Sequence, residues 1–181
     1  MNCIEAILSR RSIRCFRAEP IPAETVELLL RAGMAAPSAM NLQPWEFIIV
    51  TDRVRLTAMA EIIPYGKMLP QAALAVFICG NMRRAPEQRR ELMYWVLDCS
   101  AAAQNILLAA HGLNLGGVWL GVFPRQERMR GLAELFRLPS HIQPHSVLAL
   151  GVPDETGAVK EKFDPNKIHE EEWTGGCPDH T

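Results

Sequence analysis

The chain has 181 residues, of which 49% are hydrophobic and 22% are charged, the proportions of a globular protein. The 19 basic and 20 acidic residues leave a net charge of -1, so the chain has no overall attraction for nucleic acid. An early acid and several arginines predict that no signal peptide is present, and the longest apolar stretch, 101–115, is too short and polar to span a membrane.

The first third of the chain predicts two helices and a strand. Residues 2–10 place apolar side chains on one helical face. A second helix begins at Pro22, which suits a first helical turn, and is stopped by Pro37. The β-branched and aromatic run 45–51 predicts a buried strand, and Asp52 is a typical cap for a helix that ends near residue 62.

Strand and helix patterns then alternate. In order, the sequence predicts a strand, a long helix with Gly112 as its C-cap, a strand, a helix and a strand: 74–79, 88–111, 116–122, 125–136 and 146–151. This mixed order predicts one α+β domain over residues 1–181, with a central sheet of four or five strands.

The last part of the chain, 152–181, is polar and rich in proline. It still carries Phe163, Ile168 and Trp173, which a frayed terminus would leave exposed. We therefore expect an extended tail that lies on another surface, such as that of a partner subunit.

Cysteine and histidine spacings are typical of a reduced protein without a metal site. The five cysteines form no CxxC pair, and the five histidines form no HxxxH or HExxH pattern. We expect reduced thiols and a cytoplasmic location.

The densest chemical signal is the arginine segment, residues 10–17, which reads RRSIRCFR. Cations at a helix C-terminus complement the helix dipole, but that explains one or two arginines rather than four in eight residues. Guanidinium groups and a hydroxyl suit a phosphate. The residues alone leave an anion site and a structural role equally open.

Three further signals have a structural and a functional interpretation. Segment 36–45 reads APSAMNLQPW, and it is either a helix-to-strand turn or a rigid loop that offers planar polar groups to a heterocycle; alone, it favours the turn. Gly116 and Gly117 allow a close approach, equally to a ligand or to the long helix. Lys160 and Lys162 point the same way in an extended segment, although a solvated tail is the simpler interpretation.

Together, these signals resemble the FMN-dependent nitroreductase family over nearly the whole chain. Segments 10–16 and 36–45 look like its two flavin-binding segments. Residues 98–105 followed by 116–121 are similar to its central helix and next strand, and 168–173 resembles its C-terminal signature.

The resemblance implies a mixed α+β sheet in an intertwined homodimer with FMN at the subunit interface. Residues 10–14 would come from one subunit and 37–43 from the other. By this resemblance the cofactor-binding residues are Arg10, Arg11, Ser12, Arg14, Pro37, Ser38, Ala39, Asn41, Gln43, Lys67, Gly116, Gly117, Lys160 and Lys162.

Roles within this set also follow from the resemblance. Arg10, Lys160 and Lys162 would hold the phosphate, while Ser12 and Arg14 would reach the ribityl chain and the pyrimidine edge. A fixed cation there favours the anionic reduced flavin, and Arg14 is the first candidate, with Lys67 the second. No side chain is assigned as a catalytic acid, base or nucleophile, because flavin N5 carries the chemistry.

The implied function is a ping-pong oxidoreductase. NADH or NADPH reduces the flavin and leaves, and a small electrophile such as a nitroaromatic or quinone takes the electrons. Two alternatives remain: an oxygen-using or dehalogenating enzyme of the same fold, and a non-catalytic flavin-binding protein. The charged segment 81–91 is a solvated face or, less favoured, an attraction for an anionic donor, and Cys15 is expected to be a filler thiol.

Overall fold

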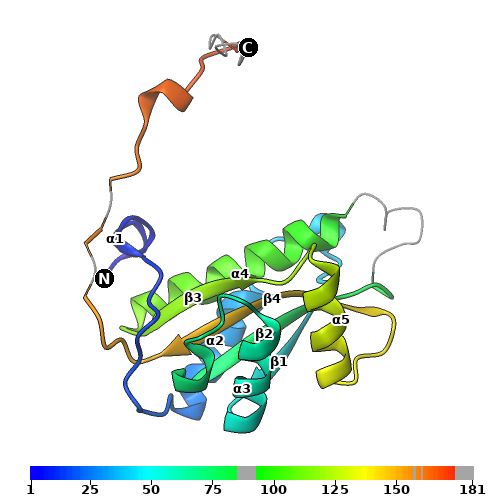
Figure 1. Cartoon of the computed structure of the whole chain (residues 1–181). Helices are drawn as coiled ribbons and strands as arrows, with labels where there is room; N and C mark the ends of the chain where they lie inside the picture. Colours follow the sequence, from blue (N-terminus) through cyan, green and yellow to red (C-terminus); the bar gives the residue numbers. More distant parts are fainter. Residues whose placement is uncertain (85–92, 157, 160, 174–181) are drawn as a thin grey trace, which may run out of the picture.

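Four strands form one sheet at the centre of the molecule (Figure 1). The structure is a computed structural model, and it describes residues 1–84, 93–156, 158–159 and 161–173. The sheet order is β1-β2-β4-β3, with the strands β1 (Trp45–Val50), β2 (Leu74–Asn81), β3 (Gly116–Gly121) and β4 (Ile142–Gly151). This confirms the α+β class and a central sheet of four strands.

The resemblance implies a mixed sheet, but the strand pairs among the described residues are all antiparallel. The connection from β1 to β2 leaves and re-enters the sheet at one end, where Val50 pairs with Ala75, and the chain direction therefore reverses. A parallel relation occurs in the described part of the chain only at the bridge between Ser12 and Gly117.

Strand β4 begins at Ile142, earlier than the predicted start at residue 146. It contains Pro144, which lies opposite the register shift between Ile78 and Cys79 of β2. A proline is tolerated at such a bulge, where the ladder of hydrogen bonds is already interrupted.

Helices cover both faces of the sheet. α2 (Ala23–Met34) and α4 (Tyr94–Gly112) contribute Leu29 and Ile106 to one core, together with the sheet residue Val76. α3 (Arg53–Ile62) and α5 (Gln126–Leu135) contribute Leu56 and Leu132 to the other core, together with Phe77. Val76 and Phe77 are neighbours on β2 and point to opposite faces, as the alternation of a strand requires.

The short helix α1 (Cys3–Ser9) lies apart from these layers and contacts α4. Three single-turn helices, η1 (Ala39–Asn41), η2 (Leu69–Gln71) and η4 (Pro165–Lys167), complete the described elements.

Helix ends test the capping predictions. The Asp52 carboxylate accepts from the N–H of Arg55 at 3.0 Å, which confirms it as the cap of α3. Gly112, however, is the last residue of α4 rather than its C-cap. The left-handed residue that ends this region is Asn114, with φ of 61°, and Asn is among the few side chains that tolerate this conformation. The predicted helix start at 88 lies outside the described residues.

The tail leads away from the body of the molecule (Figure 1). Phe163, Ile168 and Trp173 are 72%, 58% and 74% exposed within one chain. Within the described ranges, no helix is long and apolar enough to cross a membrane.

Candidate functional site

The arginine segment is fixed by backbone contacts on both sides. The N–H of Ile13 donates to the Gly117 carbonyl of β3 at 3.1 Å. On the other side, the N–H of Arg17 donates to the Val152 carbonyl at 2.9 Å, and Phe16 bridges to Pro153 beyond β4. Its apolar side chains, Ile13 and Phe16, are buried, so the polar side chains between them point outward.

The two glycines of β3 make room for this arrangement. A Cβ on Gly116 would lie 2.7 Å from Cγ2 of Ile13, and a Cβ on Gly117 would lie 2.9 Å from Cδ2 of Leu107 on α4. Gly117 therefore packs against the long helix, and Gly116 admits the arginine segment itself. The contact of Gly117 supports the interpretation as packing against the long helix, while the predicted contact of both glycines with a flavin stays a prediction.

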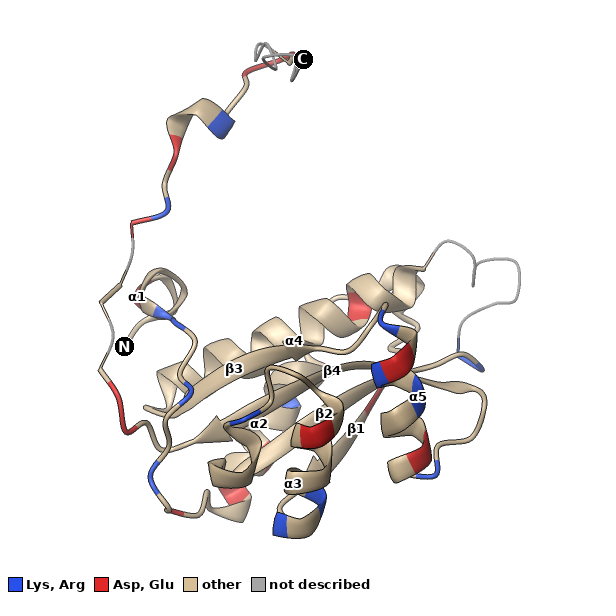
Figure 2. Ribbon diagram, viewed as in Figure 1, with Lys and Arg blue, Asp and Glu red and all other residues tan. Residues whose placement is uncertain are grey.

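Cations line a cavity of about 360 Å³ beside this segment. Figure 2 shows the basic residues that follow α1, on the side where the tail begins. The lining residues are Leu8, Arg10, Arg11, Ser12, Arg14, Ala158, Val159 and Lys162. Five predicted site residues thus meet in one cavity.

The arginines in this cavity lack acidic partners among the described residues, since the ion pairs formed there do not include Arg10, Arg11 or Arg14. Nε of Arg11 is buried and has no hydrogen-bond partner among the residues that the structure describes. By contrast, Arg17 does not line the cavity and pairs with Asp154 at 3.4 Å. An unpaired buried donor and several unpaired cations indicate a site built for an anion.

The pKa of a nearby histidine is affected by this positive charge. His111 of α4 lies 2.8 Å from the hydroxyl of Ser9 at the end of α1. Burial lowers the pKa of His111, and the nearby charges of Arg11 and Arg10 lower it further. A neutral imidazole therefore accompanies the two guanidinium groups.

Glu155 is the acid nearest to the segment, but it binds the backbone. Its carboxylate accepts the N–H of Arg14 and, at 3.3 Å, the N–H of Cys15. The Arg14 bond is the main cause of the lowered pKa of Glu155. Glu155 in turn raises the pKa of Cys15, which keeps this exposed thiol protonated and supports its interpretation as a filler.

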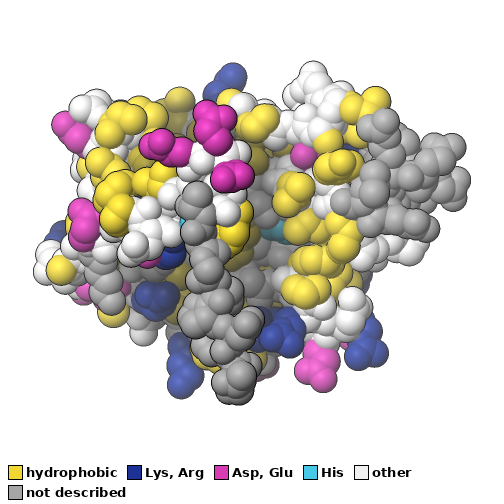
Figure 3. Space-filling view, turned by 90° about the horizontal axis from the view of Figure 1, so that it is seen from above, with side chains coloured by type: hydrophobic (Ala, Val, Ile, Leu, Met, Phe, Trp, Pro, Cys, Tyr) yellow, Lys and Arg dark blue, Asp and Glu magenta, His cyan; other side chains and the backbone are white. Residues whose placement is uncertain are grey.

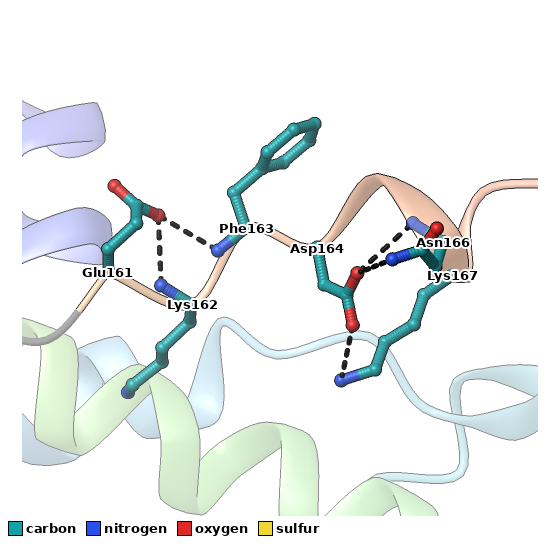
Figure 4. A network of polar contacts seen from close by, with 6 residues as sticks. All are labelled: Glu161, Lys162, Phe163, Asp164, Asn166 and Lys167. Atoms are coloured by element: carbon teal, nitrogen blue, oxygen red, sulfur yellow. Dashed lines mark hydrogen bonds and ion pairs between the residues drawn. The ribbon is translucent and has the colours of Figure 1, made fainter.

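The tail supplies Lys162 to the cavity. The Glu161 carboxylate accepts the N–H groups of Lys162 and Phe163, at 2.9 and 2.8 Å (Figure 4). The Lys162 side chain and the Phe163 ring point in opposite directions (Figure 4). This local turn therefore separates a basic group that lines the cavity from an aromatic group that is exposed. Lys160, the other predicted lysine, lies outside the described residues.

The second predicted segment, residues 37–43, is here named the amide loop. Its side chains bond mainly to one another: the N–H of Gln43 donates to the Ser38 hydroxyl at 3.0 Å, and Nε2 of Gln43 donates to Oδ1 of Asn41 at 3.1 Å. Met40, Asn41 and Gln43 have φ of 53°, 55° and 49°, in the left-handed region that side chains other than glycine rarely adopt. The loop is therefore a defined, strained structure rather than a generic turn.

A residue of α4 anchors the amide loop. The carboxylate of Asp98, which is only 7% exposed, accepts the N–H of Ala39 at 2.9 Å. Burial raises the pKa of Asp98, and the Ala39 bond partly offsets this rise. The sequence motif around Asp98 was recognised, but the residue itself was missed as a site residue. A lone acid on the apolar face of a long helix is the signal that identifies it.

The two segments lie at opposite ends of α4. The arginine segment adjoins His111 and the amide loop adjoins Asp98, thirteen residues earlier, which is about 20 Å along a helix. Within one chain, the structure therefore does not bring the amide loop into the arginine cavity.

Other predicted features also lie apart from this cavity. Lys67 is exposed between α3 and η2 and does not line it. A larger cavity of about 510 Å³ borders α2 and β1 and contains none of the predicted site residues. Arg83 and Arg84 are exposed, while 85–91 of the charged segment lie outside the described residues. The described part of the chain contains no metal-binding cluster of His, Cys, Asp or Glu.

Comparisons with known proteins give a consistent result. The model of the Nitroreductase family matches residues 7–65 and 63–152. A relative from Methanothermobacter thermautotrophicus, whose provisional name is NADH dehydrogenase/NAD(P)H nitroreductase, is 43% identical over 96% of this chain and 88% of its own.

Solved structures agree. A protein from Parabacteroides distasonis with the same provisional name has a TM-score of 0.88 and 42% identity, covering 94% of this chain and 98% of its own. The NADPH:FMN oxidoreductase of Vibrio harveyi, solved with NAD+, has a TM-score of 0.87 and 30% identity, covering 98% of this chain and 80% of its own.

Proposed function

The chain belongs to the nitroreductase family, and we propose that its arginine cavity holds the phosphate end of FMN in a homodimeric, ping-pong oxidoreductase. FMN-dependent electron transfer from NAD(P)H is the activity of this enzyme, as the relatives of this family indicate. Its physiological acceptor is proposed to be a small electrophile such as a nitroaromatic or a quinone.

The observation that carries this proposal is the unpaired positive charge in the cavity of about 360 Å³. Arg10 and Lys162 line it, and the buried Nε of Arg11 has no partner in the described part of the chain. A phosphate monoester would satisfy these donors and offset their mutual repulsion. The residues present therefore fit the phosphate of FMN, and the same chemistry would suit Lys160.

The remaining groups would orient the ring. Arg14 is an exposed cation of the cavity and would favour negative charge on the pyrimidine end of the bound ring. In the amide loop, Nδ2 of Asn41 and Oε1 of Gln43 form no hydrogen bonds with described residues, so they can offer a donor and an acceptor to the ring edge. When bound, FMN would supply hydride acceptance and delivery.

A homodimer is part of the proposal because the two segments are about 20 Å apart on one α4. A second subunit could bring its amide loop to the arginine cavity of the first. Apolar side chains of α1 and α4 support an interface: Ile4, Leu8 and Leu97 are 64%, 70% and 62% exposed. Figure 3 shows hydrophobic side chains gathered in two areas on this face.

The tail belongs to the same proposal. Residues 152–181 would pack on the partner subunit and so cover Phe163, Ile168 and Trp173, while residues 1–181 form one domain. Light scattering should give twice the mass of one chain. Replacing Phe163 and Trp173 by serine should shift the protein toward monomer, and an unchanged dimer would contradict this role of the tail. A cytoplasmic location remains part of the proposal.

The decisive experiment is to purify the protein, release its pigment by heat and identify it by chromatography. We expect FMN, and oxidation of NADH or NADPH that requires a nitroaromatic or quinone acceptor. Colourless protein that binds no added FMN would contradict the proposal. A bound flavin that neither nicotinamide reduces under anaerobic conditions would favour the non-catalytic alternative, and rapid oxygen-dependent flavin destruction would favour the oxygen-using one.

A further inference from the structure

Burying the carboxylate of Asp98 costs free energy, and the packing of α4 does not require a carboxylate at this position. An apolar residue at this position would pack without the cost of removing a charge from water. Among the described residues, its side chain bonds only to the N–H of Ala39, at 2.9 Å, which belongs to the amide loop rather than to the core. Asp98 therefore acts on the loop more than on the helix.

The amide loop needs an outside acceptor at this atom. Its internal bonds use the N–H groups of Asn41, Leu42 and Gln43, which donate to the Ser38 carbonyl, the Ala39 carbonyl and the Ser38 hydroxyl. Ala39 is the first residue of η1, so its own N–H has no acceptor within that turn. Asp98 supplies the missing acceptor immediately before the left-handed residues.

The backbone conformation of those residues is energetically unfavourable. Met40, Asn41 and Gln43 are each left-handed; Asn tolerates this backbone, but at Met40 and Gln43 it persists only where the surroundings impose it. In this conformation Asn41 and Gln43 are both exposed, and their side chains bond to each other.

We propose that Asp98 is a positioning residue for FMN binding: through the Ala39 N–H it holds the amide loop in the left-handed conformation that presents Asn41 and Gln43. The proposal rests on the function proposed above. Asp98 needs no contact with the flavin, because it acts through the backbone of the loop.

The test compares Asp98→Ala with Asp98→Asn, which keeps an oxygen acceptor, and with Ser100→Ala as the control. Ser100 is on the same helix; its hydroxyl bonds to the Val96 carbonyl at 2.7 Å, lies 3.2 Å from Nε2 of His145, and makes no bond to the loop. We expect Asp98→Ala to weaken FMN binding about tenfold, while Asp98→Asn and Ser100→Ala stay within about threefold of the parent.

Hydrogen exchange of the backbone amides of residues 38–43 in the flavin-free protein gives an independent readout. Asp98→Ala should accelerate exchange in this loop by about tenfold, and Ser100→Ala should not. If Asp98→Ala does not fold, Asp98→Leu replaces it, because leucine fills the space without an acceptor.

Two results overturn the proposal. One is a folded Ala or Leu variant with parental loop exchange or parental FMN affinity, even if it melts at a lower temperature. The other is an equal loss in Asp98→Asn, which would assign the effect to charge rather than to the hydrogen bond. A parent protein that takes no FMN contradicts the proposed function instead, and loop exchange still tests the action of Asp98 separately.

Discussion

The arginine segment and the amide loop differ in what their side chains do. In the arginine segment, the backbone is held by β3 and residues 152–155, while the side chains of Arg10, Arg11 and Arg14 form no ion pair with any described residue. In the amide loop, the side chains of Ser38, Asn41 and Gln43 are themselves used to hold a strained backbone. The first region therefore offers charge, and the second offers shape.

The largest expected effect tests the charge of the first region. Replacing both Arg10 and Arg14 by alanine should weaken FMN binding by at least about 100-fold, because each charge-assisted hydrogen bond is worth about 1.5–3 kcal/mol. Calorimetric or fluorescence titration with FMN measures this. Arg17→Ala is the matched control, since Arg17 pairs with Asp154 and does not line the cavity. If the double variant purifies fully loaded with flavin, the comparison fails.

A second prediction concerns the frame that joins the two regions. The middle of α4 packs against His145, which is 4% exposed and lies 3.2 Å from the hydroxyl of Ser100. Burial lowers the pKa of His145 from 6.5 to about 4. The unfolded chain then binds a proton at higher pH than the folded chain. Stability present above pH 6.5 is therefore lost as the pH falls toward 4, by up to about 3 kcal/mol.

Urea denaturation between pH 7.5 and 4.5 measures this loss. His145→Gln has no imidazole to protonate, and its stability should depend less on pH over that range. If the free energy of unfolding falls equally with pH in both proteins, groups other than His145 cause the acid sensitivity.

A smaller effect tests shape in the second region. Ser38→Ala removes the acceptor of the Gln43 N–H, which should cost about 1 kcal/mol and weaken FMN binding about fivefold. Ser140→Ala, at an exposed serine outside both regions, serves as the control. A Ser38→Ala protein that binds FMN as tightly as the parent would show that the loop keeps its conformation without this bond.

The smallest effect is a change in titration at His111. Arg11 and Arg10 contribute to its lowered pKa, so an anion that offsets their charge should raise it. NMR titration of His111 with and without inorganic phosphate or FMN measures the direction. The same linkage predicts that FMN binding strengthens slightly as the pH falls through this pKa. A pKa that stays constant on FMN binding would place the phosphate elsewhere.

Much of the fold could be predicted from periodicity and capping residues, as at the Trp45–Val50 strand and the Asp52 cap, because these signals are local. The antiparallel direction of every described strand pair could not, because it depends on where connections re-enter the sheet. The sequence does not predict the start of β4 because a bulge at His145 of β4 lets the strand continue through Pro144.

The candidate site, like the fold, could be predicted where the signal is local in sequence and not where it depends on tertiary packing. Clustered arginines are contiguous in sequence, so their shared cavity follows from local composition. Asp98 and Ala39 are 59 positions apart, and their bond appears only when α4 packs beside the loop. Lys67 was placed by resemblance alone, and within one chain it remains outside the cavity.

The length of α4 limits where residues can be inserted or deleted in this protein. His111 near one end and Asp98 near the other are joined by uninterrupted helix. Inserting one residue between them would rotate one end against the other by about 100° and lengthen the helix by about 1.5 Å. A single substitution leaves the register of α4 unchanged, whereas an insertion or deletion between these two positions should displace the amide loop from its place relative to the arginine segment.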